Sequence, residues 1–119
     1  MNCRGLRDRQ KRNTLFHFLK KQKAPIMFLQ ETHSRIDDEN EWQKQFKGNI
    51  YFNHNTDRGA GQAILINTKK ITVLNHSVTI PGRLQYCTIK INENIIAFVN
   101  IYAPNIDSAR VKFLETLKK

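Results

Sequence analysis

The sequence predicts a mixed α/β layered fold for a chain of 119 residues. Three observations support this prediction: an amphipathic helical pattern near the N-terminus, a short uninterrupted apolar run directly after it, and a second half in which short apolar runs alternate with turn residues. A helix, a buried strand, a short helix and then mostly strands is an order typical of layered α/β domains. Because there is no internal repeat, low-complexity segment or linker, one domain over residues 1–119 is expected.

The first element is predicted to be a helix over Asp8–Lys23. Leu15, Phe18 and Leu19 fall on one helical face, whereas the basic residues of this segment lie largely elsewhere. Pro25 prevents the helix from continuing, because its ring clashes with the preceding turn and it has no N–H to donate. The helix is therefore expected to have an apolar inner face and a basic outer face.

The run Ile26–Leu29 is too short for a helix and is bounded by Pro25 and by polar residues. Such a run is typical of a strand that is buried on both faces. Glu31 would then emerge at the C-terminal edge of this strand.

A short helix is predicted over residues 39–47. Asp38 and Glu41 have the spacing of a capping box, and Trp42 and Phe46 form an i, i+4 apolar pair. The acidic side chains of this segment are therefore assigned to the helix itself.

The rest of the chain is predicted to be mostly antiparallel sheet, because it is rich in Ile, Val and Thr between turn residues. The expected strands are residues 50–52 and 63–66 as one adjacent pair, residues 71–80 and 84–91 with one polar face, and residues 95–102 as a central strand. Asn100 is the unexpected polar residue inside the last of these. Beyond it, Asp107 can cap a final helix.

The composition is strongly basic, with 20 Lys and Arg against 10 Asp and Glu, a formal net charge of +10 and a pI of about 10.0. A basic surface accelerates encounter with nucleic acid, whereas a membrane partner would favour a basic amphipathic helix with a strongly apolar face. We therefore expect a nucleic acid as the partner and no membrane. Charge alone does not separate an enzyme from a ribosomal or histone-like chain, or from an ordinary solvated basic face.

The cysteines and the N-terminus predict the compartment. Cys3 and Cys87 lie far apart, with no Cys-x-x-Cys or Cys/His cluster, so neither a disulfide framework nor a zinc site is expected. No apolar run approaches the length that crosses a bilayer, and polar and basic residues follow Met1 instead of a signal-peptide core. The expected location is intracellular, nuclear or cytoplasmic, and not secreted.

Polar side chains collect where predicted strands end, which is where open α/β sheets gather binding sites. Glu31 is the one acidic residue so placed, and Mg²⁺ takes oxygen ligands and often needs only one or two carboxylates besides waters and a substrate phosphate. Asn2, Tyr102 and Asn105 at neighbouring strand ends would orient a phosphodiester and stabilise charge on its oxygens. The commoner roles of such residues are a solvated Glu and an Asn that forms a turn.

Four strings, taken together and in order, carry a family resemblance: NCRGL at residues 2–6, IMFLQETH at 26–33, GAGQAILIN at 59–67 and VNIYAPN at 99–105. They resemble the endonuclease domain of LINE-type retrotransposons, in the endonuclease/exonuclease/phosphatase superfamily, over essentially the whole chain. The resemblance implies part of a four-layer α/β sandwich, related to deoxyribonuclease and apurinic endonucleases, with a mixed, mostly antiparallel sheet and flanking helices. It also implies Mg²⁺-assisted cleavage of one DNA strand, leaving a 3′-hydroxyl that primes a reverse transcriptase covalently linked in the full-length element.

The same resemblance implies roles for individual residues. Glu31 resembles the metal-binding carboxylate, Asn2 the amide that supports metal and phosphate, and Tyr102 with Asn105 the pair near the scissile phosphate. Mg²⁺ is the implied ion, with Mn²⁺ as a substitute and no small-molecule cofactor. The side chains expected on the nucleic-acid side are Arg4, Lys11, Arg12 and His33, with ordinary solvated charge as the alternative for the three cations and packing as the alternative for the histidine.

The chain also departs from the family pattern. The family has a short hydrophobic strand before the first Asn, where only Met1 stands here, and a second half with an Asp-x-Asn segment and a late Asp-His pair. This sequence has no Asp-His dipeptide, and Asp38-Glu39-Asn40 matches the Asp-x-Asn spacing only at a predicted helix start. We therefore expect residues 1–119 to be an incomplete domain, to expose apolar surface that favours association, and to be inactive alone.

Two alternatives from other classes stay open. A noncatalytic basic module would bind nucleic acid through Lys and Arg independently of Glu31. A retroelement remnant without selected function would show no cooperative melt. Other branches of the superfamily act on phosphoinositides, sphingomyelin or poly(A) tails, but the charge and the NIYAPN string favour DNA.

Overall fold

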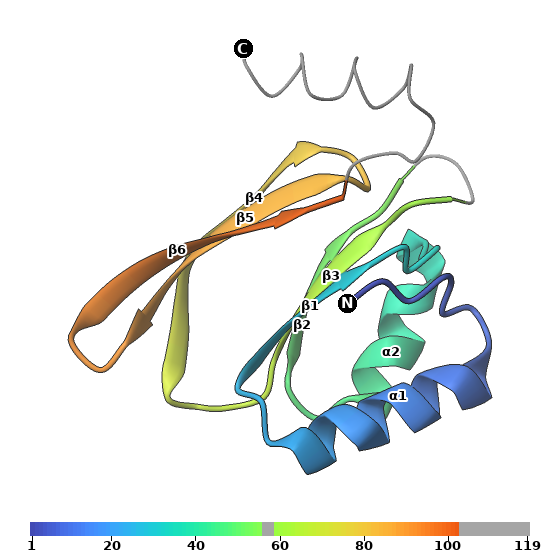
Figure 1. Cartoon of the computed structure of the whole chain (residues 1–119), viewed down its shortest axis with the longest axis horizontal. Helices are drawn as coiled ribbons and strands as arrows, with labels where there is room; N and C mark the ends of the chain where they lie inside the picture. The colour runs from blue at the N-terminus through green and yellow to red at the C-terminus, as the bar shows by residue number, and fades with distance from the viewer. Residues whose placement is uncertain (56–58, 103–119) are drawn as a thin grey trace.

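The computed structural model describes residues 1–55 and 59–102, in which two three-stranded antiparallel sheets lie face to face (Figure 1). Helices α1 (Arg9–Gln22) and α2 (Glu39–Gln45) cover the outer face of the first sheet, and a short 3₁₀ helix, η1 (Ile36–Asp38), precedes α2. One apolar cluster lies between the helices and the first sheet, and a second lies between the two sheets. These layers confirm the predicted α/β class.

Helix α1 begins and ends as the sequence predicts. The Asp8 carboxylate caps it by accepting from the backbone N–H of Gln10 at 2.8 Å. The helix ends where Lys23 takes a left-handed conformation with a φ of 54°. Neither α1 nor any other helix in the described part of the chain is long and apolar enough to cross a membrane.

The inner face of α1 differs from the prediction, because Arg12 and Phe16 are buried and Phe18 is not. Its buried side chains are Arg12, Phe16 and Leu19, an i, i+4, i+7 row, with Leu15 half-buried beside them. Phe18 is 49% exposed, so its expected place in the core was wrong. The reason is geometric, because Phe18 lies about 200° around the helix from Phe16.

Strand β1 (Ile26–Gln30) has apolar neighbours on both faces, as predicted. Met27 and Leu29 pack into the cluster beneath the helices, whereas Ile26 and Phe28 pack into the cluster between the sheets. Alternate side chains of a strand point to opposite faces, which accounts for this division.

Helix α2 is shorter than predicted, because Phe46 already takes an extended conformation. The predicted capping box of Asp38 and Glu41 was also wrong. Asp38 accepts instead from the backbone N–H of Arg35 at 2.9 Å, and the Glu41 carboxylate pairs with arginine side chains of α1. Trp42 and Phe46 are both buried, as their i, i+4 spacing predicts.

Strand β3 (Gln62–Ile66) is the centre of the first sheet, with β1 and β2 (Asn49–Asn53) antiparallel on either side. The predicted adjacent antiparallel pair is therefore confirmed, and every residue of β3 is buried. Gly48 precedes β2, and a Cβ there would lie 2.1 Å from the carbonyl oxygen of Ile66. Only glycine allows the chain to pass this close to β3.

The second sheet contains β4 (Ile71–Ile80), β5 (Leu84–Ile91) and β6 (Asn94–Ile101) in chain order. The bounds of β4 and β5 agree with the predicted ranges. Alternation along β5 places Cys87 and Ile89 in the cluster between the sheets, which confirms its predicted polar and apolar faces.

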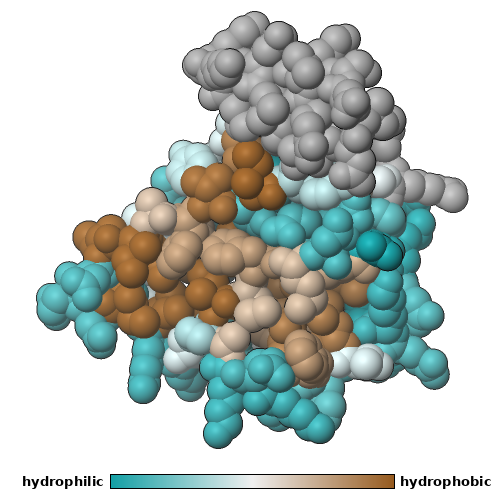
Figure 2. All heavy atoms as spheres, viewed as in Figure 1, coloured by the Kyte–Doolittle hydropathy of each residue, from teal (hydrophilic) through white to brown (hydrophobic). Residues whose placement is uncertain are grey.

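Strand β6 is largely exposed, although its apolar sequence predicts a central strand. Among the described residues it lies at the edge of the second sheet, and Ile95 and Val99 are 65% and 62% exposed. Figure 2 shows the apolar surface that gathers over this side of the molecule. Only Phe98 and Asn100 pack inward, because alternate residues of β6 face the first sheet. The prediction of a central strand was wrong for this reason, and the expected association through apolar surface stays a prediction.

Candidate active site

The N-terminal segment runs beside the end of β1. Asn2 forms a parallel bridge with Gln30, since the Gln30 N–H donates to the Met1 carbonyl and the Cys3 N–H donates to the Gln30 carbonyl, both at 2.8 Å. These bonds fix Asn2 at the carboxyl end of β1, where Glu31 follows. The two residues predicted to hold a metal therefore lie at the same edge of the sheet.

Glu31 and His33 leave β1 through left-handed backbone, each with a φ of 55°. Such backbone costs about 1–3 kcal/mol for each residue other than glycine. Hydrogen bonds on both sides hold it: the Thr32 N–H donates to the Gly61 carbonyl at 3.1 Å, and the Gly5 N–H donates to the Glu31 carbonyl at 2.6 Å. Gly61 has a φ of 93°, and a Cβ there would lie 2.6 Å from Thr32 Oγ1. The loop that carries Glu31 is thus closely confined.

Tyr102 reaches Glu31 from the end of β6. Its backbone N–H donates to the Arg83 carbonyl at 2.9 Å, and its hydroxyl donates to Oε1 of Glu31. Two predicted site residues that are 71 positions apart in the sequence are therefore in direct contact. The structure brings Glu31 and Tyr102 together and places Asn2 at the same edge, whereas Asn105 lies outside the described residues.

Arg83 is a site residue that the sequence analysis missed. Its guanidinium lies 5.7 Å from the centroid of the Tyr102 ring, within the range of a cation–π interaction. Its Nη1 atom is buried and has no hydrogen-bond partner among the described residues, although such a donor costs about 1–3 kcal/mol. A cation at this position would attract an anionic ligand to the site. In the sequence, Arg83 is marked only by its position after the Pro81-Gly82 turn.

A buried network of side-chain amides fixes the strand end that carries Tyr102. The side-chain Oδ1 of Asn100 accepts from Gln30 Nε2 at 2.6 Å, and its Nδ2 donates to Gln85 Oε1 at 3.1 Å. Gln62 Nε2 donates to the backbone carbonyls of Asn100 and Arg83, each at 2.9 Å. These bonds join strands from both sheets directly behind the candidate site. The unexpected polar residue inside β6 is therefore a structural tie between the sheets.

The donor set at this edge fits Mg²⁺ in kind. Glu31 offers a carboxylate and Asn2 an amide oxygen, and hard divalent cations prefer such ligands. The Asn2 oxygen already accepts from the backbone N–H of Arg4 at 3.1 Å, which fixes its position. No group of three or more His, Cys, Asp or Glu side chains that could hold a metal occurs in the described ranges. Glu31 is thus the one carboxylate this edge would supply, and waters and a phosphate would complete the coordination.

Three of the four residues predicted on the nucleic-acid side lie near this edge. Arg4 is exposed, and the ammonium of Lys11 donates to the Cys3 carbonyl at 3.0 Å, beside the N-terminal segment. His33 is half-buried and packs against Gly5, where a Cβ would lie 2.7 Å from the histidine Nδ1. Arg4 and Lys11 therefore keep positive charge close to Asn2.

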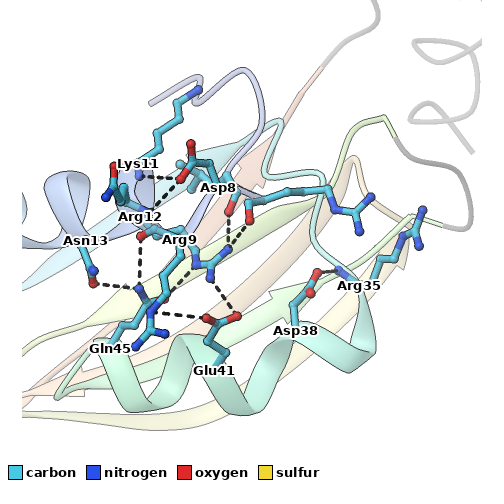
Figure 3. Close-up of polar contacts among 12 residues, drawn as sticks. Asp8, Arg9, Lys11, Arg12, Asn13, Arg35, Asp38, Glu41 and Gln45 are labelled. Atoms are coloured by element: carbon cyan, nitrogen blue, oxygen red, sulfur yellow. Dashed lines mark hydrogen bonds and ion pairs between the residues drawn. The ribbon is translucent and has the colours of Figure 1, made fainter.

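Arg12 is not available to nucleic acid, so its predicted role was wrong. Its side chain is 2% exposed and points toward α2 (Figure 3). The guanidinium donates to the Leu6 carbonyl and to Gln45 Oε1 at 2.8 Å each, and pairs with Glu41 at 2.9 Å. It also lies 5.6 Å from the centroid of the Trp42 ring. The guanidinium is thus enclosed by partners from α2 and from the segment before α1.

Cys3 provides a pH-dependent test of how tightly the N-terminal segment packs. Burial raises the pKa of its thiol from 9.0 to about 11. The unfolded chain therefore loses the thiol proton at lower pH than the folded chain does. The stability that the buried thiol contributes is fully present below pH 9 and is lost as the pH rises toward 11. We expect the wild type to lose about 2 kcal/mol more than Cys3→Ala between pH 8 and pH 11, measured by urea denaturation. Equal losses in both proteins would show that folding does not raise the pKa of the Cys3 thiol.

Comparison with known proteins gives a family and a fold. The model of the Endonuclease/Exonuclease/phosphatase family matches residues 1–116. A Xenopus laevis protein, the transposon TX1 uncharacterized 149 kDa protein, is 30% identical over 118 residues. That match covers 98% of this chain and 9% of the transposon protein, so the chain spans a small part of that relative.

Similar solved structures include TDP2 from Caenorhabditis elegans, with a TM-score of 0.67 and 20% identity over 90% of this chain and 34% of that one. Danio rerio TDP2 complexed with a single-strand DNA product has a TM-score of 0.62 and 17% identity, over 89% of this chain and 45% of that one. A functionally unknown conserved protein from Enterococcus faecalis has a TM-score of 0.66 and 14% identity, over 91% and 52% of the two chains. At these identities the likeness shows a shared α/β sandwich fold, of which this chain spans about one third to one half.

Proposed function

Because the chain belongs to the endonuclease/exonuclease/phosphatase family, we propose that it carries part of the active site of a Mg²⁺-dependent DNA-nicking endonuclease. In the proposed reaction the oxygen of a water molecule bonds to phosphorus, and the bond between phosphorus and O3′ breaks. O3′ takes up a proton and leaves as a 3′-hydroxyl, the end that target-primed reverse transcription extends. The similarity to a transposon protein supports this role for the product.

The contact between Glu31 and Tyr102 is the observation that carries the proposal. A carboxylate that accepts from a tyrosine hydroxyl, with the Asn2 amide at the same edge, gives oxygen donors for a cation. With the cation on the carboxylate, the hydroxyl would turn from Glu31 to donate to a phosphate oxygen. Mg²⁺, when bound, would supply positive charge that stabilises the oxygens of the phosphodiester. Glu31 and Asn2 would hold it, Tyr102 with Asn105 would orient the scissile phosphate, and Arg83 would add charge beside the tyrosine ring.

The isolated residues 1–119 are proposed to be inactive. The resemblance implies a proton-transferring histidine in an Asp-His pair and an Asp-x-Asn segment after a buried strand, and this sequence contains neither in that setting. Hydrolysis needs a proton donor for the departing O3′ and support for the phosphate from the opposite side. The part of the site in residues 1–119 would therefore bind Mg²⁺ and DNA weakly without cutting DNA.

DNA is the proposed partner, and the net charge of +10 with exposed Arg4 and Lys11 beside the site supports it. In a full-length element the domain would be covalently linked to a reverse transcriptase. A substrate of this kind implies action inside the cell, in the nucleus or the cytoplasm.

A noncatalytic nucleic-acid-binding module is the second candidate, favoured by the same exposed cations. It predicts salt-sensitive DNA binding that Glu31→Ala leaves unchanged and no binding of a divalent cation through Glu31. A retroelement remnant without selected function is a third hypothesis, and a circular dichroism melt without a cooperative transition would support it.

Nicking of supercoiled plasmid in Mg²⁺ tests the proposal, with Glu31→Ala and EDTA as controls. We expect no nicking by residues 1–119 and DNA binding that weakens steeply as salt rises. Nicking that is lost in both controls would confirm the metal-dependent endonuclease and overturn the proposed inactivity. Absence of DNA binding at low salt would contradict the proposed substrate.

A further inference from the structure

A continuous chain of side-chain hydrogen bonds runs from α2 to the loop that carries Glu31. Glu39 Oε2 lies 2.7 Å from His54 Nε2, and His54 Nδ1 lies 3.0 Å from Ser34 Oγ. Ser34 Oγ in turn lies 2.8 Å from Thr32 Oγ1. Glu39 begins α2, His54 directly follows β2, and the two hydroxyl residues lie in the loop after β1. We call these four residues the relay.

The relay has the residue types of a serine-hydrolase triad, but its burial excludes that chemistry. Ser34 is 2% exposed and Thr32 is fully buried, so no substrate carbonyl can approach the serine hydroxyl. A nucleophile must be within reach of its substrate as well as of its base. The relay is therefore a structural connection between elements.

The hydrogen bonds of the relay have one consistent direction when His54 is neutral. Because the Glu39 carboxylate only accepts, the hydrogen on the ring must be at Nε2. Nδ1 then accepts from the Ser34 hydroxyl, which leaves the Ser34 oxygen to accept from Thr32. The ring is also stacked on Phe52, with centroids 5.1 Å apart. His54 is thus fixed at both nitrogens and on one face.

Thr32, the last member of the relay, lies between two residues of its loop that have left-handed backbone, Glu31 and His33. Such backbone persists only where the surroundings determine it. The backbone N–H groups of Thr32 and His33 donate to the carbonyls of Gly61 and Ala60. The relay adds a hydrogen bond to the side chain of Thr32. Loss of the relay would leave Thr32 free to change rotamer and the loop free to relax.

We propose that His54 is a positioning residue for the carboxylate of Glu31, acting through Ser34 and Thr32 on the backbone conformation of the loop. The inference rests on the proposed function in one respect, the role of Glu31 in binding a divalent cation. His54 itself touches neither substrate nor cation. It sets the direction in which the Glu31 side chain leaves the end of β1.

The test compares His54→Phe, which keeps a ring on Phe52 but removes both hydrogen bonds, with His54→Asn, which returns a polar atom near the position of Nδ1. His17→Phe, at an exposed position on α1, is the matched control. Amide hydrogen exchange at Thr32 and His33 reports on the loop, exchange at Ile64 in β3 reports on global stability, and a Mn²⁺ titration reports on the carboxylate.

We expect His54→Phe to accelerate exchange at Thr32 and His33 by about tenfold and to weaken Mn²⁺ binding several-fold, with exchange at Ile64 nearly unchanged. His54→Asn should recover most of both losses, and His17→Phe should change neither. Unchanged exchange in the loop would overturn the proposal, as would equal acceleration at Ile64, which would mean a general loss of stability. Failure of the wild type to bind Mn²⁺ would overturn the proposed function, and with it the part of this proposal that concerns cation binding. The exchange data at Thr32 and His33 would still decide whether His54 holds the loop.

Discussion

Replacement of Arg12 by alanine is expected to lower the free energy of unfolding by about 3 kcal/mol. The side chain is 2% exposed, and its removal would leave the Leu6 and Arg7 carbonyls without a donor that now lies at 2.8 Å from each. Breaking a buried ion pair costs about 3–5 kcal/mol, and the lower end applies because the Glu41 side chain is 45% exposed and can be rehydrated. Urea denaturation of both proteins measures the difference.

Arg9→Ala is the matched control for this prediction. Arg9 also approaches Glu41, at 3.6 Å, but its side chain is 72% exposed. Such a pair contributes at most about 0.5 kcal/mol, so the control should unfold almost as the wild type does. Similar losses in Arg9→Ala and Arg12→Ala would contradict the structural role assigned to the buried guanidinium.

Glu31→Gln is expected to weaken the binding of Mn²⁺, used as a paramagnetic substitute for Mg²⁺, by at least about tenfold. The substitution keeps the shape of the side chain and its contact with Tyr102 but removes the negative charge that attracts the cation. Electron paramagnetic resonance of free Mn²⁺ measures the affinity. Glu93→Gln, at an exposed carboxylate in the turn between β5 and β6, is the control and should have no effect.

Local pattern was sufficient to predict most of the fold. The alternation of apolar and polar residues along 84–91 and the turn before it predict β5 to the residue, because each strand face has its own environment. The pattern is not sufficient for burial that depends on distant elements. Arg12 has the same helical context as its exposed basic neighbours, and only the approach of Glu41 and Gln45 from α2 makes its burial favourable.

Strand β6 shows the opposite limit. Its near-continuous apolar residues predict cover on both faces, but the described elements pack only on its inner face, where Phe98 contacts Phe28 with ring centroids 5.4 Å apart. An apolar sequence shows which side chains favour burial. Whether they are buried depends on the other helices and strands that pack against the strand.

The candidate site was predictable in part for similar reasons. Glu31 and Tyr102 follow apolar runs, so both were expected at strand ends, and the structure brings their side chains into contact. Arg83 and His54 could not be found in this way, because each lies in a turn-like segment of the sequence. Their roles depend on contacts across the sheets, with Tyr102 for Arg83 and with Ser34 for His54.

The central claim is that Glu31 belongs to a cation site that a DNA phosphate completes. It is tested most directly by titrating Mn²⁺ into the wild-type chain and into Glu31→Gln, each with and without a short DNA duplex. We predict that DNA tightens Mn²⁺ binding to the wild type by about fivefold or more, that Mn²⁺ tightens DNA binding by the same factor, and that Glu31→Gln loses this coupling. DNA binding that is indifferent to Mn²⁺ in the wild type, with equal Mn²⁺ affinity in both proteins, would contradict the claim and identify a noncatalytic nucleic-acid-binding module instead.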